Sequence, residues 1–423
     1  MNLARKKGPK ITEQLSVSVP RVNQWVLPNG IPVFEISSNK HEVFKVEAVH
    51  QGGRIQEDKR LVNRVTSTIM KEGTENYPSK VLADKIDFYG ATLSVRSNMD
   101  NTSHTLYGLT KYADVLLPML GDIIHHPVFD PVELDKYIKR NVTNLGIELR
   151  KNDVVAYREL TEDIFGGDHP YGFNSNAALY RSIVTDDLIQ HFHNNFGADN
   201  CSLFLSGDID DKMRDAISRI FGNRNNSIVK KPFQESIIKP IPELKRIKIG
   251  SPSQSAIIIG RKLFSRNNVD YPTWVVLNTV LGGYFGSRLM KSIREEKGLT
   301  YNISSFVDTM RYDGHFYITC EVAHENVDSC LQGIFQEIEK LKSSLIPTQE
   351  LTMVKNYING NILNMLDGPF KSSKWIKSLY LDGLKLSDGM EIIDRISGVT
   401  AEEIRELAQK YLAEEVLNKV IVS

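Results

Sequence analysis

The most distinctive stretch of the sequence is Leu281-Gly282-Gly283-Tyr284-Phe285-Gly286-Ser287-Arg288-Leu289, which runs into Arg294-Glu295-Glu296-Lys297-Gly298-Leu299-Thr300-Tyr301. Its closely spaced glycines predict a place where the backbone approaches another group closely, because glycine has no Cβ. Apolar spacing predicts a helix before the stretch (274–281) and another after it (287–296). The order G-x-x-x-x-G-K-[ST] is missing, so the stretch does not indicate a phosphate-binding loop. A tight helix-to-helix turn remains the alternative.

Working outward from this stretch, the same order of signals occurs twice. Each half shows a glycine-led strand, a second strand, a long helix and then a Pro-containing start of another helix. The corresponding ranges are 90–96, 102–108, 113–125 and 130–134 in the first half, and 298–304, 314–322, 327–341 and 347–351 in the second. We therefore expect an α+β fold with two similar domains, each a mostly antiparallel sheet covered on one face by helices.

Residues that break regular structure separate the two halves. Gly222, Asn223, Pro232, Pro240 and Pro242 fall within a polar stretch, which predicts a linker. The expected organisation is an N-terminal arm (1–20), a first domain (21–222), a linker (223–247) and a second domain (248–423). The first sheet is expected to open with the hairpin around Asn29-Gly30, since Asn and Gly tolerate positive φ between apolar runs.

Composition limits the classes of partner. Lys plus Arg (52) equals Asp plus Glu (52), so no overall charge draws the chain to nucleic acid or to an anionic membrane. The three cysteines, Cys201, Cys320 and Cys330, form no C-x-x-C pair and are too few for a disulfide framework. No apolar segment reaches the length of a membrane span. We expect a cytoplasmic protein that binds neither nucleic acid nor membrane.

The sequence resembles the pitrilysin/insulinase-type zinc peptidases, also called inverzincins. That family carries G-G-x-F-x-S-R-L followed by R-E-x-x-G-L-x-Y in its second domain, and this chain matches both patterns between Gly282 and Tyr301. Further matches are Leu27-Pro28-Asn29-Gly30, Lys71-Glu72-Gly73-Thr74, His169-Pro170-Tyr171-Gly172 and Ser253-Gln254-Ser255-Ala256. The resemblance covers residues 20 to 423 and implies a two-domain half-shell.

The zinc motif of the family is absent. Its H-x-x-E-H places two imidazoles on one helix face, with a glutamate as general base. Counting back from Gly73-Thr74, these positions hold Arg64, Ser67 and Thr68, and none of these side chains can replace the family's residue. The third ligand falls near Asn141, with Glu148 as the alternative counterpart. No two histidines are spaced i, i+4, so we expect neither zinc nor another metal in this chain.

The resemblance assigns a role to the second-domain residues that remain. Arg294 matches an arginine that holds a substrate carbonyl or carboxylate, and Tyr301 matches a tyrosine that donates to the developing oxyanion. Gly282, Gly283, Tyr284, Phe285 and Gly286 are then expected to bind an extended peptide. The alternative is structural: Arg294 pairs with Glu295 or Glu296 on the surface, and Tyr301 lies in the core.

A chain with this pair but without zinc ligands is expected to be the non-catalytic subunit of a two-chain peptidase. Its partners would be a homologous subunit bearing H-x-x-E-H and an unfolded peptide. The isolated chain is expected to be inactive, and whether it forms a homodimer stays open. The competing hypothesis is a structural or peptide-binding scaffold subunit. A third, an active homodimeric peptidase with another metal site, conflicts with the lack of ligands.

Overall fold

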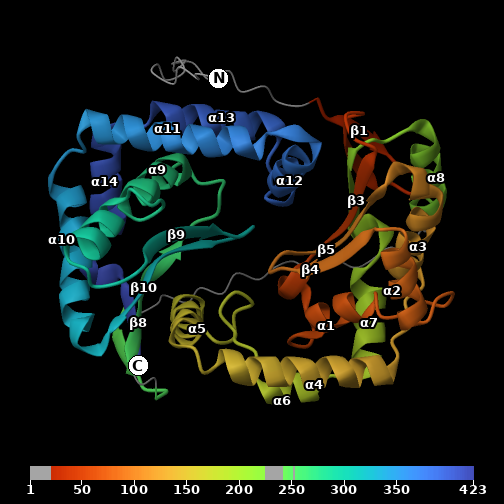
Figure 1. Cartoon of the computed structure of the whole chain (residues 1–423), viewed down its shortest axis with the longest axis horizontal. Helices are drawn as coiled ribbons and strands as arrows, with labels where there is room; N and C mark the ends of the chain where they lie inside the picture. The colour runs from red at the N-terminus through yellow and green to blue at the C-terminus, as the bar shows by residue number, and fades with distance from the viewer. Residues whose placement is uncertain (1–20, 224–241, 251–252) are drawn as a thin grey trace, which may run out of the picture.

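The computed structural model describes residues 21–223, 242–250 and 253–423, which form two sheets, one from each half of the chain (Figure 1). The expected arm, 1–20, lies outside the described residues. The first sheet has the order β1-β2-β6-β3-β5-β4, and all neighbours are antiparallel except β2 and β6. Its strands are β1 (Asn23–Val26), β2 (Pro32–Ser37), β3 (Val43–Gln51), β4 (Thr92–Ser97), β5 (Asn101–Leu109) and β6 (Cys201–Gly207).

The second sheet repeats the topology of the first. Its order is β7-β11-β8-β10-β9, with β7 and β11 parallel and the other neighbours antiparallel. Each strand of the second sheet therefore has a counterpart in the first, beginning with β7 and β2, and within the described residues β1 is the additional strand of the first sheet. This confirms the expected two-domain α+β fold. Its strands are β7 (Leu244–Ile247), β8 (Gln254–Leu263), β9 (Ile303–Thr309), β10 (Gly314–Ala323) and β11 (Asn418–Val422).

The hairpin of the first sheet forms where the sequence predicts it. β1 and β2 are antiparallel, and the Leu27 N–H donates to the Ile31 carbonyl at 2.9 Å. Gly30 has φ 90°, which a residue with a Cβ rarely adopts. The Asn29 amide also donates to the Phe221 carbonyl at 2.8 Å, so the turn is attached to the last helix of the first half.

Helices cover the outer faces of both sheets (Figure 1). In the first half, α3 and α8 pack with the strands around a core that contains Phe44, Leu116 and Ile217. The helices of this half are α1 (Val62–Ile69), α2 (Ser79–Phe88), α3 (Ala113–His125), α4 (Pro131–Glu148), α5 (Asn152–Phe165), α6 (Ala177–Arg181), α7 (Thr185–Asn195) and α8 (Asp211–Phe221), with 3-10 turns η1 (Gly53–Gln56), η2 (Thr110–Tyr112) and η3 (Ala198–Asn200).

In the second half, α9, α10 and α14 pack together around Trp274, Ile334 and Leu407. The helices of this half are α9 (Tyr271–Leu281), the π-helix η4 (Met290–Glu296), α10 (Val327–Ser343), α11 (Thr348–Met365), α12 (Gly368–Leu381), α13 (Leu386–Gly398) and α14 (Ala401–Tyr411), with 3-10 turns η5 (His324–Asn326) and η6 (Glu414–Val416).

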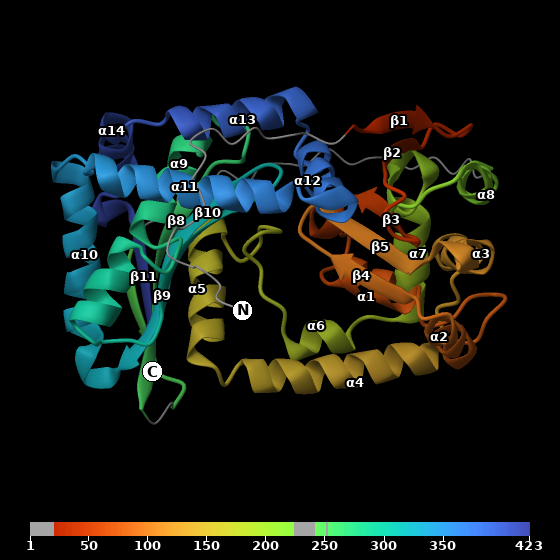
Figure 2. The ribbon, with the colours of Figure 1, turned by 45° about the horizontal axis from the view of Figure 1, so that its top comes forward.

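Each half also contributes one helix that packs against the sheet of the other half. In the views of Figures 1 and 2, α5 lies against the second sheet and α12 against the first. Ala156, Leu160 and Ile164 of α5 share a core with Ile258 of β8 and Val420 of β11. The sequence analysis expected helices on one face of each sheet, whereas the structure covers part of the opposite face as well. Burial of apolar side chains on this face explains the difference.

The exchange explains why β3 is buried along nearly its whole length. Lys45 and Glu47 are only 3% and 4% exposed, although alternate residues of a one-sided sheet would face water. Lys377 of α12 forms an ion pair with Glu47, and Lys45 lies 3.5 Å from the same carboxylate. A buried charge is tolerated when an opposite charge lies beside it. The two halves are thus joined by an ionic contact as well as by apolar packing.

The boundary between the halves stays a prediction. Most of the expected linker, 223–247, lies outside the described residues, and its last four residues form β7 of the second sheet. Over the described part of the chain, no helix is long and apolar enough to cross a membrane.

Candidate functional site: the predicted metal-site positions and the glycine-rich segment

Helix α1, on which the family's zinc ligands would lie, is fixed in place by buried polar contacts. Asn63 donates to Ser97 Oγ at 2.8 Å and to Thr102 Oγ1 at 2.9 Å, which ties the helix to β4 and β5. His191 Nε2 lies 3.1 Å from Asn63 Oδ1, and His104 Nε2 lies 3.0 Å from the Ser67 carbonyl. These histidines therefore support the inner side of α1.

Both supporting histidines are held neutral by their surroundings. Burial lowers the pKa of His104 to about 4, against the Ser67 contact, which raises it. Burial likewise lowers the pKa of His191 to about 4. A neutral imidazole donates from one nitrogen only, so each ring keeps one defined tautomer toward α1.

The N-terminus of α1 is held by a half-buried carboxyl group. The Glu57 carboxylate accepts hydrogen bonds from the backbone N–H groups of Leu61 and Asn63, both at 3.0 Å. It thereby caps N–H groups in the first turn that have no partner within the helix. Burial raises the pKa of Glu57 to about 7, although these N–H groups and the Arg54 charge lower it. Leu61 has φ 72°, a strained value for a side chain of this size.

Three of the four predicted metal-site positions meet at one place. Arg64 and Thr68 of α1 and Asn141 of α4 line a cavity of about 510 Å³. Ser67 is fully buried, and its hydroxyl donates to the Arg64 carbonyl at 3.1 Å. Glu148, the alternative counterpart of the third ligand, forms an ion pair with Lys151 at 2.7 Å and does not line this cavity. The geometry therefore favours Asn141 as the counterpart.

The cavity has the wrong chemistry for a cation. Its lining comprises Arg64, Thr68, Val95, Arg96, Ser97, Asn98, Tyr137, Arg140 and Asn141. This set contains three guanidinium groups and no carboxylate, imidazole or thiol. Within the described ranges, no group of three or more His, Cys, Asp or Glu side chains is placed to hold a metal ion. The sequence prediction that the chain lacks zinc still requires a metal measurement.

Sequence reasoning missed most of this lining. Tyr137 and Arg140 precede Asn141 by four and by one residue on α4, so placing Asn141 on a helix would have found Tyr137 one turn earlier. Arg96 was not predictable in this way, because it comes from edge strand β4, whose position beside α1 depends on the tertiary fold.

In the second half, the glycine-rich segment joins α9 to the π-helix η4. Part of it packs against the protein itself. The Gly282 carbonyl accepts the Ser305 N–H at 3.1 Å, and a Cβ at Gly282 would lie 2.7 Å from that nitrogen. Gly282 is therefore required by close contact with β9. Tyr284 also packs internally, with its ring 4.9 Å from that of Tyr357.

The rest of the segment faces outward. Gly283, Phe285 and Gly286 are exposed, and the Phe285 side chain is 66% exposed. The Arg294 guanidinium carbon lies 4.8 Å from the centre of the Phe285 ring, a cation–π contact. The sequence predicts a helix over 287–296, and the structure has a π-helix at Met290–Glu296, a form often found at functional sites. Arg294 is thus held by an exposed ring, which differs from the alternative of a surface pair with Glu295 or Glu296.

Tyr301 lies fully at the surface. Its side chain is 90% exposed, so the alternative that it packs in the core does not hold. The cavity on α1 is lined by first-half residues alone, and the structure does not join Arg294 or Tyr301 to it. The chain therefore presents two separate features. One is the cavity at Arg64, Thr68 and Asn141, and the other is a segment in which Phe285 and Tyr301 are exposed and Arg294 is half-buried.

One residue of the matched motif has a structural role. Arg288 contacts Glu350 of α11 through two hydrogen bonds, Nε to Oε1 at 2.8 Å and a terminal nitrogen to Oε2 at 2.9 Å. This two-point geometry orients the segment relative to α11.

A model of the family described as "Peptidase M16 inactive domain" matches residues 182–358. The chain is 24% identical over 351 residues to an "Uncharacterized zinc protease YmxG" of Bacillus subtilis, covering 81% of this chain and 84% of the relative. It is 22% identical to a "Non-peptidase homolog YmxG" of Helicobacter pylori, covering 89% and 88%. A "Probable inactive metalloprotease YmfF" of Bacillus subtilis is 20% identical, covering 81% and 84%.

Two solved structures share the fold. One is a peptidase M16 inactive domain from Pseudomonas fluorescens, with TM-score 0.84, 21% identity and coverage of 95% of this chain and 98% of that one. The other is a protease from Helicobacter pylori, with TM-score 0.87, 14% identity and coverage of 96% and 100%.

The chain is thus similar over most of its length to proteins described as M16-type proteases and as their inactive homologues, and the sequence of α1 does not contain H-x-x-E-H. The resemblance to pitrilysin/insulinase-type peptidases is confirmed, and the chain fits the inactive members of the M16 family.

Proposed function

We propose that this chain is the zinc-free subunit of a heterodimeric M16-type peptidase and supplies peptide-binding and oxyanion-stabilising residues to a zinc-bearing partner. The observation that carries the proposal is the contrast between its two halves. The first half has Arg64, Thr68 and Asn141 where ligands would stand, while the second half holds a half-buried Arg294 against the exposed Phe285 ring and an exposed Tyr301.

The exposure of Tyr301 supports a role toward another molecule. A phenol that is 90% exposed contributes little to the core, and its hydroxyl is free to donate to an oxyanion formed outside this chain. Arg294, held over Phe285, offers a fixed cation for a substrate carbonyl or carboxylate. The exposed backbone of Gly283 and Gly286 can approach an extended peptide closely.

A scaffold subunit without a catalytic contribution is the second candidate. The packing of Gly282 on β9 and the Arg288–Glu350 contact favour it, because both give a structural reason for part of the motif. Neither contact explains Arg294, Phe285 or Tyr301, and the first proposal is therefore preferred.

Mixing tests the proposal. The purified chain, a homologous subunit with H-x-x-E-H and a mixture of the two are each assayed on an unfolded peptide. Activity that appears only in the mixture supports shared catalysis. If the zinc-bearing subunit is as active alone as in a mixture that forms a stable complex, the chain is a scaffold.

A further inference from the structure

We propose that the cavity between α1, β4 and α4 is an anion-binding site, which takes a phosphate or carboxylate group through Arg64, Arg96 and Arg140. The inference rests on this cavity alone and does not require a peptidase partner. Each arginine comes from a different element, so the cluster is a product of the fold.

The charge of the cavity is strongly one-sided. The cavity is lined by three guanidinium cations, and no acidic residue is part of the lining. The Arg64 charge affects its surroundings: burial raises the pKa of the neighbouring Tyr137 phenol, and Arg64 opposes that shift. Three cations around one cavity repel each other, and a bound anion would offset this repulsion by attracting all three.

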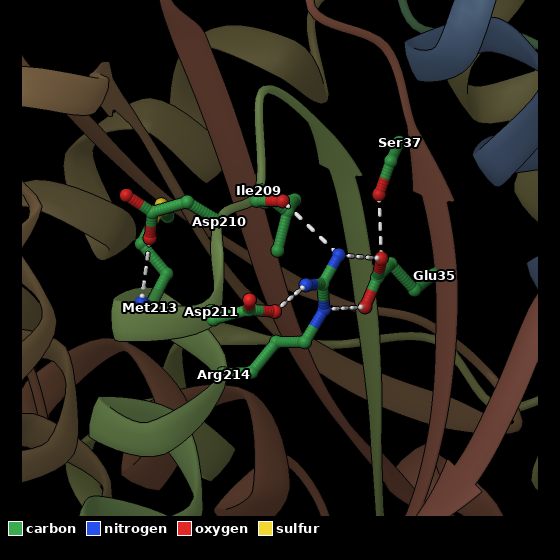
Figure 3. Close-up of polar contacts among 7 residues, drawn as sticks. All are labelled: Glu35, Ser37, Ile209, Asp210, Asp211, Met213 and Arg214. Carbon is green, nitrogen blue, oxygen red and sulfur yellow. Dashed lines mark hydrogen bonds and ion pairs between the residues drawn. The ribbon is translucent and has the colours of Figure 1, made fainter.

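Buried or structural arginines in this protein look different. Arg214 reaches both oxygens of Glu35, Nε to Oε2 at 3.0 Å and a terminal nitrogen to Oε1 at 2.7 Å, and also pairs with Asp211 (Figure 3). Arg288 and Glu350 form a similar fork. Among the described residues, by contrast, Arg64, Arg96 and Arg140 have no carboxylate within 4.0 Å. Arg64 hydrogen-bonds with Tyr137, and the Arg140 guanidinium carbon lies 5.7 Å from the centre of the Tyr137 ring, so the partners of these two arginines here are neutral and not anionic.

Neutral groups around the arginines add hydrogen-bonding capacity. The lining includes the hydroxyl groups of Thr68 and Ser97 and the amide of Asn98. Hydroxyls and amides can donate to the oxygens that remain after two guanidinium contacts. The three arginines are exposed, so the interaction will weaken as salt rises.

The position of the cavity allows two sources of the anion. Arg64, Ser97 and Asn98 also line a second cavity of about 440 Å³, which includes Arg266 and Ser378 of the second half. The lining of this second cavity is mixed in charge, because it also contains Glu57, Asp100 and Asp382. An acidic side chain of a peptide lying between the halves could therefore reach the arginines, as could a free anion from solution. The recognised chemistry is the same in both cases.

Binding measurements on the full chain test the site. Inorganic phosphate, a peptide Ac-Ala-Glu-Ala-Glu-Ala-amide and its glutamine counterpart are titrated by calorimetry at low ionic strength. The variants are Arg64→Gln, Arg140→Gln and the triple change that adds Arg96→Gln. Arg150→Gln is the matched control, because Arg150 lies just beyond the end of α4 and outside the cavity. Unfolding curves verify that each variant is folded, and the single variants serve if the triple one is not.

We expect the control to bind like the parent chain and the single cavity variants to lose roughly 10-fold in affinity, about the value of one charge-assisted contact. Phosphate binding identifies a free anion as a ligand. Binding of the glutamate peptide without its glutamine counterpart identifies a carboxylate carried by a peptide. The proposal is overturned if neither probe binds, or if binding is the same in the parent chain and the folded cavity variants.

Discussion

Arg64 on α1 and Asn141 on α4 line the same cavity, although they lie far apart in the sequence. In an active relative these positions would hold two of three zinc ligands, and here they hold a guanidinium and an amide. If this assignment of positions is correct, the chain differs from an active relative here in its side chains, while the elements that carry them still meet at one cavity.

If only the side chains have changed, zinc binding should be recoverable. The triple variant Arg64→His, Thr68→His, Asn141→Glu places two imidazoles and a carboxylate around the cavity, the ligand set of a catalytic zinc site. We expect about one zinc per chain after dialysis, measured by elemental analysis, and none in the parent chain.

The double variant Arg64→His, Thr68→His is its control and also separates Asn141 from Glu148. Because Glu148 pairs with Lys151, it should not replace the third ligand, and zinc should be lost on dialysis. Stoichiometric zinc in the double variant would show that Glu148 is the true counterpart.

Gly282→Ala should destabilise the second half. The new Cβ would lie 2.7 Å from the Ser305 nitrogen and Oγ, so α9 or β9 must shift. Overpacking of this kind costs about 1–3 kcal/mol of unfolding free energy, measurable in urea. Gly360→Ala is the control, because nothing lies within 4 Å of a Cβ there and alanine favours helix α11. Equal stabilities of the two variants would argue against close packing at Gly282.

Lys377→Met should weaken the attachment of α12 to the first sheet. It leaves the buried Glu47 carboxylate with only Lys45, and removing one partner of a buried ion pair costs about 3–5 kcal/mol. Because Lys45 stays beside Glu47 in this variant, we expect the loss of unfolding free energy to lie at the lower end of that range. Lys374→Met on the same helix replaces an exposed lysine and should leave the urea midpoint nearly unchanged. A midpoint unaffected by either change would contradict the role of this contact.

His104 should make the folded state sensitive to acid. Burial lowers its pKa from 6.5 to about 4, so between these values the unfolded chain binds more protons. Its contribution to stability is present above pH 6.5 and is lost as pH falls toward 4, with a slope of up to about 1.4 kcal/mol per pH unit. Glu57 acts in the opposite direction from pH 4.5 to 7, because its folded pKa is raised to about 7.

His104→Asn should therefore flatten the pH dependence of unfolding between pH 6.5 and 4, as measured by urea midpoints. His193→Asn replaces an exposed histidine and should leave that dependence as in the parent chain. An unchanged slope in His104→Asn would show that this ring does not carry the effect.

Local elements were predictable because their signals are local. The periodic apolar residues of 113–125 and the Asn29-Gly30 turn predict a helix and a hairpin from short-range preferences, and both form. The exchange of α5 and α12 was not predictable, because an apolar helix face does not specify which sheet it covers.

The site was predictable to the extent that a motif marks it. Counting from Gly73-Thr74 located Arg64 and Thr68, and the structure brings them together with Asn141. The motif could not reveal the positive charge of the cavity. Arg96 and Arg140 come close to Arg64 only after β4 and α4 have packed around α1. Likewise, nothing local distinguishes Arg288, which binds Glu350, from Arg294, which lies on an exposed ring.

The most direct test of shared catalysis is the turnover number of the mixed complex when this chain carries Tyr301→Phe. The change removes one hydroxyl from a side chain that is 90% exposed, so folding and assembly should be retained. Tyr107→Phe in β5 of the first half is the matched control. We predict a fall in turnover of about 100-fold to 1,000-fold for Tyr301→Phe, the usual effect of losing an oxyanion donor, and no comparable change for the control. An assembled complex whose turnover is the same with Tyr301→Phe as with the unaltered chain would contradict the account.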